Sequence, residues 1–274
     1  MDGTANRTHT GGGNGNGCGN GAGNGIENGI ENGCTELTPR EFADRRARLQ
    51  ERLRNHGLAG CMVTQNVGIY YFAGTMQAGY LFIPAEGEAT FYVVRSLARA
   101  EKESRVRAVP LASFRQFGRQ LADDYPSVFS ASGRPAVGAD LDVMPARLYL
   151  RLAEAVPQVA WTDASAHLRT VRSVKSPAEI ALIAAAGKTA DAVLTALLHQ
   201  LKEGMTELEA MGIVEAELRR HGHAGIFRMR GYNQETISGF LSSGEAAAEP
   251  SSFDGPVGAR GLSPAVPVSV SRRK

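Results

Sequence analysis

The sequence predicts a protein of the α/β (α+β) class, in which helices pack on a mixed β-sheet. Three observations carry this prediction. Segments of strand character alternate with segments of helical periodicity between residues 38 and 163. Two neighbouring strand segments are separated only by a short turn at residues 84–87, which indicates a hairpin. Two longer helical patterns follow the last strand. Crossover connections together with one hairpin give a sheet of mixed direction covered by helices.

The composition is that of an ordinary globular protein that can bury a core. The chain has 274 residues, of which 43% are hydrophobic and 21% charged, and its net charge is +2 at pH 7. So small a net charge creates no field that would attract nucleic acid or acidic lipid. Cys18, Cys34 and Cys61 are too scattered for a disulfide framework or a CxxC pair. No uninterrupted apolar run reaches the ~18 residues of a membrane span, and the first residues lack the layout of a signal peptide. We therefore expect a cytoplasmic protein with neither nucleic acid nor a membrane as a partner.

Residues 1–36 are dominated by glycine and asparagine and contain the internal repeat GIENGIENG. Such a segment has little apolar surface to bury and much backbone entropy to lose, so we expect a disordered tail. A phosphate-binding glycine loop would need a strand before it and a helix after it. Neither flank is present in the sequence.

The first helix is predicted to begin at Pro39. Thr38 supplies the N-cap, Pro39 occupies the first helical position, and Glu41 places a carboxylate in the first turn. Gly57 closes the helix.

The remaining elements of the first 165 residues follow from the same periodicity and turn signals. We expect strands at residues 60–64, 79–83, 89–94, 107–111, 136–139 and 159–163. We expect helical segments at residues 66–72, as a short helix or turn, and at 97–104, 114–125 and 145–155. Together they form a domain of about 130 residues, which is a common size.

Two further helices are predicted after residue 176. A long helix begins at Pro177, and its apolar residues recur near helical spacing. The second helix has Thr206 as N-cap and Glu209 three residues later, the pattern of a capping box, and it ends at Gly222. From residue 226 onward we expect strand and loop.

Several motifs occur in the order and spacing of one known family. The segment NVGIYYFAG at residues 66–74 carries an Asn, Tyr and Gly pattern, and LRTVRSVKSPAEIALIAAAGKTAD follows at residues 168–191. EGMTE comes next at residues 203–207, and the helix after it ends in His-Gly at residues 221–222. These motifs resemble the creatinase and Xaa-Pro aminopeptidase family of metallopeptidases, with a similarity that spans roughly residues 38–267.

The resemblance implies a creatinase-type N-terminal mixed-sheet domain at residues 37–167. An incomplete first half of a pita-bread metallopeptidase domain would follow at residues 168–274. The family's complete site holds two divalent ions of the Mn, Co or Zn type through two Asp, one His and two Glu, and a metal-bound hydroxide attacks the peptide carbonyl. Relatives often form dimers in which the N-terminal domain lies near the neighbour's active site.

The metal ligands of the family are not found in this sequence. The first Asp pair of the family lies a little beyond a segment like residues 261–264, but Asp254 is the last aspartate here, and neither His nor Glu follows it. We therefore assign no metal ligand, no bound cofactor and no catalytic residue.

Ser251 occupies the position at which the family has a histidine after a Ser-Gly pair and a proline. A hydroxyl group cannot supply the proton chemistry of an imidazole near neutral pH. Ser251, Phe253 and Asp254 remain the candidates for a substrate pocket.

Three other groups of polar residues are interpreted as structural. Residues 215–223 have the order E-x-E-x-x-x-H-x-H at a helix end, which is not the HExxH of zinc proteases. The serines at 242–243 and 251–252 lack the GxSxG motif of a hydrolase. Asp140 and Asp142 are two residues apart in a segment where turn and cap chemistry is expected.

Three functional hypotheses follow. The first is a truncated relative of the Xaa-Pro aminopeptidases and dipeptidases that is inactive alone, because the metal-ligand region is absent. The second is a non-catalytic binding or dimerisation module, either a homodimer or a regulator that pairs with a full-length relative. The third is an incomplete gene product. Prolyl peptides, creatine and other small amides all stay open as substrates of the parent enzyme.

Overall fold

The computed structural model describes residues 37–225, 228–231, 241–249 and 261–262. The predicted tail at residues 1–36 and most of the strand and loop predicted after residue 226 lie outside these ranges.

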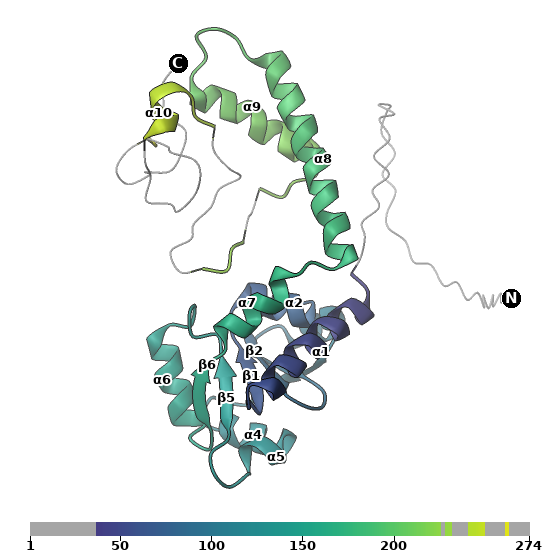
Figure 1. Cartoon of the computed structure of the whole chain (residues 1–274), viewed down its shortest axis with the longest axis vertical. Helices are drawn as coiled ribbons and strands as arrows, with labels where there is room; N and C mark the ends of the chain where they lie inside the picture. The colour runs from purple at the N-terminus through teal and green to yellow at the C-terminus, as the bar shows by residue number, and fades with distance from the viewer. Residues whose placement is uncertain (1–36, 226–227, 232–240, 250–260, 263–274) are drawn as a thin grey trace, which may run out of the picture. The chain divides into compact units, whose positions relative to one another are not determined.

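A six-stranded mixed sheet forms the centre of the N-terminal domain, with the order β4-β3-β2-β1-β5-β6 (Figure 1). β2 is antiparallel to both of its neighbours, whereas the other pairs are parallel, so β2 runs against the other five strands. All six predicted strands are present, within one residue at each end. Their bounds are β1 Gly60–Val63, β2 Gly79–Pro84, β3 Thr90–Val93, β4 Arg107–Pro110, β5 Ala136–Ala139 and β6 Ala160–Asp163. The predicted mixed sheet and its hairpin are confirmed.

Seven helices accompany this sheet among the described residues. They are α1 Pro39–Asn55, α2 Asn66–Ala73, α3 Leu97–Glu103, α4 Phe117–Asp124, α5 Pro126–Phe129, α6 Ala146–Ala155 and α7 Ser165–Ser173. The helix predicted at 114–125 starts three residues later than expected, and α5 follows it as a separate turn. Tyr125 has φ −135° and ψ 65° because Pro126 disfavours a helical residue before it.

Helix α7 was not predicted, and the predicted division between residues 167 and 168 falls inside it. Its first turn is held by Asp163, whose Oδ1 accepts a hydrogen bond from the Ser165 backbone N–H at 3.0 Å. Leu168 and Val171 of α7 are buried in the same core as residues of α1 and β1.

Helices cover both faces of the sheet, so the central strands are buried on both sides. Cys61 and Val63 of β1 belong to a core cluster with α1, α2, α3 and α7. Met62, between them, belongs to a second cluster with α4, α5 and α6. Successive residues of a strand point to opposite faces, so this alternation places a packed layer of helices on each side.

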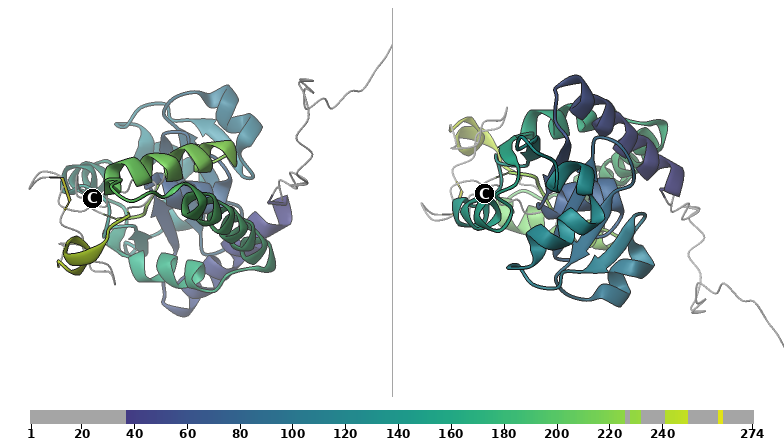
Figure 2. Two further views of the ribbon diagram at one scale, coloured as in Figure 1. Left: turned by 90° about the horizontal axis from the view of Figure 1, so that it is seen from above. Right: turned by 90° about the horizontal axis from the view of Figure 1, so that it is seen from below.

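Three helices follow the N-terminal domain: α8 Pro177–Gln200, α9 Glu207–Arg220 and α10 Gly244–Ala248. Helices α8 and α9 pack against each other (Figures 1 and 2). The predicted capping box of Thr206 and Glu209 begins α9, and a second one, of Ser176 and Glu179, begins α8. Helix α10 lies where strand and loop were expected.

Helix α8 is unusually exposed for so apolar a helix. Only Val193 and Leu197 of its residues are buried, and residues 180–188 are all exposed. In the described part of the chain, α8 is the one helix that is long and apolar enough to cross a membrane, by length and composition only. Lys188 and Asp191 lie near its middle, so the helix is not an uninterrupted apolar run.

Arg45 of α1 joins three helices. Its side chain is only 2% exposed, and it forms ion pairs with Glu41 of α1 at 3.1 Å and with Glu179 of α8 at 3.3 Å. It also donates to the backbone carbonyl of Tyr71 in α2 at 3.1 Å, and its guanidinium carbon lies 4.2 Å from the centre of the Tyr71 ring. The buried charge is thus paired, hydrogen-bonded and stacked at once.

Replacement of Arg45 by methionine is expected to lower the free energy of unfolding by about 3 kcal/mol, because Glu41 and Glu179 lose the charge that compensates their burial. Urea denaturation followed by circular dichroism measures this. Arg40→Met is the matched control, since Arg40 is on the same helix with a side chain 89% exposed, and its change should stay within about 0.5 kcal/mol. Equal effects of the two substitutions would contradict the role given to Arg45.

Candidate functional site

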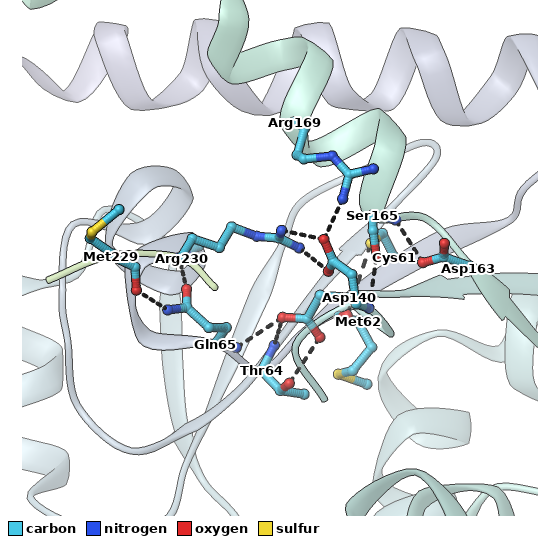
Figure 3. Close-up of polar contacts among 12 residues, drawn as sticks. Cys61, Met62, Thr64, Gln65, Asp140, Asp163, Ser165, Arg169, Met229 and Arg230 are labelled. Carbon is cyan, nitrogen blue, oxygen red and sulfur yellow. Dashed lines mark hydrogen bonds and ion pairs between the residues drawn. The ribbon is translucent and has the colours of Figure 1, made fainter. Parts of the chain in front are cut away.

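Polar residues gather at the edge of the sheet where β1, β5 and β6 end. Thr64 follows β1, Asp140 follows β5, and Asp163 is the last residue of β6. The three strands are parallel neighbours, so their carboxyl ends meet at one edge (Figure 3). In open α/β sheets this edge is the usual place for ligands.

Asp140 is fully buried and ties two loops of this edge together. Its Oδ2 accepts hydrogen bonds from the backbone N–H groups of Thr64 at 3.0 Å and Gln65 at 2.9 Å. Its Oδ1 accepts one from the Thr64 hydroxyl at 2.8 Å. Its carboxylate therefore fixes the start of α2, which supports the structural interpretation made from the sequence.

Asp142 lies two residues further along and binds two arginines. Arg230 forms a two-pronged contact with its carboxylate, with Nη1 2.6 Å from Oδ2 and Nη2 2.5 Å from Oδ1. Arg169 of α7 donates to the same Oδ2. The Arg230 side chain is only 7% exposed. Two planar groups matched in this way form the strongest kind of protein ion pair.

The electrostatics of Asp142 follow from these contacts. Burial by itself would raise the pKa of Asp142, but the hydrogen bonds from Arg230 and the charges of Arg230 and Arg169 outweigh it. The pKa of Asp142 therefore lies below its usual range. Its backbone N–H is also held, since it donates to the Ser165 hydroxyl at 3.1 Å.

A hollow of about 400 Å³ lies beside this cluster. It is lined by the first residues of α2 and the segment before them, from Thr64 to Val67, and by Arg228 and Met229. The Gln65 amide spans the two sides, because its Nε2 donates to the Met229 carbonyl at 3.4 Å while its Oε1 accepts from the Gly68 N–H at 3.0 Å. The segment 228–231 is thereby attached to the edge of the sheet (Figure 3).

Cys61 lies under this edge but has no features of a nucleophile. It is fully buried, and burial raises the pKa of its thiol well above the ordinary value. Reactive cysteines need a lowered pKa and access to solvent. We therefore assign Cys61 a packing role.

The other residues singled out in the sequence lie away from this edge or outside the described ranges. The substrate-pocket candidates Ser251, Phe253 and Asp254 lie outside the described residues. Glu217 and His221 lie at the end of α9, where the Nδ1 atom of His221 is 2.9 Å from the Glu217 carbonyl oxygen. Among the residues with described positions, no group of three or more His, Cys, Asp or Glu side chains could hold a metal ion.

The pairing of Asp142 with Arg230 was not found from the sequence. The two residues are 88 positions apart, and nothing in the local pattern around Arg230 distinguishes it from Arg228. Only the fold brings them together. The one available signal was the pair of acidic residues directly after β5.

The fold and this edge define a creatinase-type mixed α/β domain. Residues 45–174 match the Creatinase/Prolidase N-terminal domain family, so the chain contains a domain of that family.

Several solved structures have a similar fold, and their matches cover about two thirds of this chain. The Xaa-Pro dipeptidase from Bacillus anthracis is 22% identical, with a TM-score of 0.58, and the match covers 66% of this chain and 50% of that one. Dipeptidase PepE from Mycobacterium ulcerans is 25% identical, with a TM-score of 0.57 and coverage of 69% and 52%. The prolidase from Pyrococcus horikoshii OT3 is 21% identical, with a TM-score of 0.55 and coverage of 65% and 49%. The chain spans about half the length of these proteins. No curated protein matches it significantly.

Arg230→Gln should release the segment 228–231 from the sheet edge, because an amide cannot form the paired contact with Asp142. Hydrogen exchange of the backbone amides in this segment is expected to become about tenfold faster, which corresponds to the loss of one charge-assisted contact. Arg228→Gln is the control, since Arg228 is exposed and lies on the same short segment. Unchanged exchange in Arg230→Gln would show that the ion pair does not hold the segment.

The contribution of Asp142 to stability should depend on pH. The pKa of Asp142 is lower in the folded protein than in the unfolded chain, where it lies near 3.9. The stabilisation is therefore fully present above the unfolded-state pKa and is lost as the pH falls through the folded-state pKa. The unfolding free energy of the wild type should exceed that of Asp142→Asn by about 2 kcal/mol at pH 7, and the gap should close in acid. Asp123→Asn, at an exposed position of α4, should give no such gap. A gap that keeps its full pH 7 size throughout acid titration of the folded protein would contradict this account.

Proposed function

We propose that this chain is related in function to the Xaa-Pro peptidases but does not hydrolyse peptides by itself. The observation that carries the relationship is the match of residues 45–174 to the Creatinase/Prolidase N-terminal domain. The similarity in fold to the Xaa-Pro dipeptidase of Bacillus anthracis supports it.

The proposed lack of hydrolysis rests on the residues that this sequence offers for metal binding. The resemblance places the first metal ligands beyond residues 261–264, and after Asp254 the sequence has no Asp, Glu or His. The described residues offer no alternative group of ligands. The donor set therefore does not fit the two metal ions of the family, and we derive no catalytic step through them.

We further propose that residues 168–274 correspond to part of the first half of a pita-bread domain. Helices α8 and α9 follow the N-terminal domain in the order that the resemblance implies, and each begins with a capping box. The contact of Arg45 with Glu179 supports a fixed connection between the two parts.

The test is an assay of Xaa-Pro dipeptide hydrolysis by the purified chain with Mn²⁺, Co²⁺ or Zn²⁺. We expect no turnover above the rate without protein, because the residues with described positions include no group of carboxylates and histidines that could hold a metal pair. A full-length Xaa-Pro dipeptidase measured in parallel is the positive control. Titration of the chain with Mn²⁺ in a calorimeter should show no stoichiometric binding. Turnover that requires metal and stops on addition of a chelator would overturn the proposal.

A second candidate function is that of a non-catalytic dimerisation module. The exposed apolar residues of α8 favour this function. Single exposed apolar side chains are normal on a protein surface, whereas a contiguous set of them marks an interface.

A further inference from the structure

Two histidine rings meet where α1 and α7 pack against each other (Figure 1). His56 comes directly after the last residue of α1, and His167 lies on α7. Their ring centroids are 4.3 Å apart, with an angle of 54° between the ring planes. Histidine is the side chain whose charge ordinarily changes between about pH 5 and 8, so this helix contact contains two groups that can become charged in that range.

The surroundings of His167 favour its neutral form. Its Nδ1 atom is buried and has no hydrogen-bond partner among the residues with described positions. A neutral imidazole can leave this nitrogen unprotonated, whereas an imidazolium carries a proton on both nitrogens. Protonation would therefore place an N–H group where no described acceptor receives it, which costs free energy.

The charges around His167 act in the same direction. Arg52 and His56 at the end of α1, and Asp163 at the end of β6, are the titratable or charged groups that act on it within the described ranges. Burial lowers the pKa of His167 most, followed by the charges of His56 and Arg52, and together they outweigh Asp163. The Asp163 carboxylate is engaged elsewhere, because its Oδ1 accepts hydrogen bonds from the Ser165 backbone N–H and hydroxyl.

Helix α7 itself also opposes a positive charge at this position. His167 is the third residue of α7 and lies in its first turn. The positive end of the helix dipole is at that turn, and it disfavours a cation there.

His56 is held in place by the end of α1. Its Nδ1 atom is 2.8 Å from the Arg52 carbonyl oxygen. A carbonyl oxygen only accepts hydrogen bonds, so this nitrogen carries a proton whether the ring is neutral or charged. Protonation at Nε2 therefore leaves the ring in place, and the charge of His56 then acts on His167 across the ring contact.

Helix α7 links the two histidines to the edge of the sheet. Its Ser165 hydroxyl accepts a hydrogen bond from the Asp142 backbone N–H at 3.1 Å, and its Arg169 donates to the Asp142 carboxylate. Two of the contacts that hold Asp142 therefore depend on the position of α7. A movement of α7 away from α1 would loosen this edge.

We propose that His56 and His167 form a pH-sensitive latch, in which protonation weakens the packing of α7 on α1 and loosens the sheet edge at Asp142. When α7 opens, His167 reaches water and recovers its ordinary affinity for protons, so the open form binds a proton more readily than the closed form. The closed form is therefore most stable above the ordinary histidine pKa near 6.5, and it loses stability as the pH falls from there toward the lowered pKa of His167.

This pH range distinguishes the latch from the titration of Asp142, whose carboxylate takes up a proton only below its ordinary pKa near 3.9. The latch requires no peptidase activity, so it stands or falls separately from the proposed function.

The test compares hydrogen exchange of the whole chain at about pH 7 and about pH 5.5, with rates expressed as protection factors that correct for the intrinsic effect of pH. The backbone amides of α7 should lose protection by about threefold or more at the lower pH. The Asp142 amide should follow, because it donates to Ser165. The amides of the central strand β2 should keep their protection, since the opening is local. His167→Phe retains a ring but no titrating nitrogen, and it should abolish the loss in α7.

His199→Phe is the matched control, since His199 is exposed on α8 and its replacement should leave the pH dependence of α7 unchanged. Circular dichroism verifies that both variants keep the wild-type fold. Titration of the imidazole signals by nuclear magnetic resonance needs no substitution, and the signal of His167 should titrate below its ordinary pKa near 6.5. Equal protection of α7 at both pH values, a pH dependence that persists in His167→Phe, or an equal loss of protection in β2 would each overturn the proposal.

Discussion

The connection between the N-terminal domain and the helices that follow depends on one buried arginine. Arg45 lies between Glu41 and Glu179, with the Tyr71 carbonyl and aromatic ring beside it. An unpaired charge at this depth would cost several kcal/mol, so the three helices that supply the partners cannot separate without exposing it. Because of this ion pair, the packing of α1 against α2 is stabilised only when the first turn of α8 is in place. Glu179 serves both purposes, because it also completes the capping box of α8.

The fold could be predicted from sequence to the extent that its signals are local. Strands β1, β2 and β3 are short, apolar and bounded by turn residues, and α1 and α9 start with cap residues that satisfy free N–H groups. Helix α7 escaped prediction because its start depends on Asp163, which the sequence identifies only as the end of a strand. The separation of α4 from α5 follows from Pro126, which is a local signal of the sequence.

The sheet edge could be predicted only in part. Asp140 and Asp142 mark the end of β5, and their structural role follows from their position after a strand. The partners of these two aspartates could not be predicted, because Thr64, Arg169 and Arg230 come from three distant parts of the chain. A buried ion pair needs two groups brought together by the whole fold, and sequence spacing carries no information about that distance.

The pairing of Asp142 with Arg230 has a consequence for the time course of synthesis. The family match ends at residue 174, and by then every strand of the sheet and both core clusters have been made. Arg230 is 56 residues later, which at ribosomal rates of 5 to 20 residues per second is a delay of about 3 to 11 s. Of the two arginines that bind Asp142 in the structure, Arg169 alone has been made during that interval. Asp142 is thus synthesised before Arg230, so the segment with Arg230 can dock on the sheet edge only as a late step of synthesis.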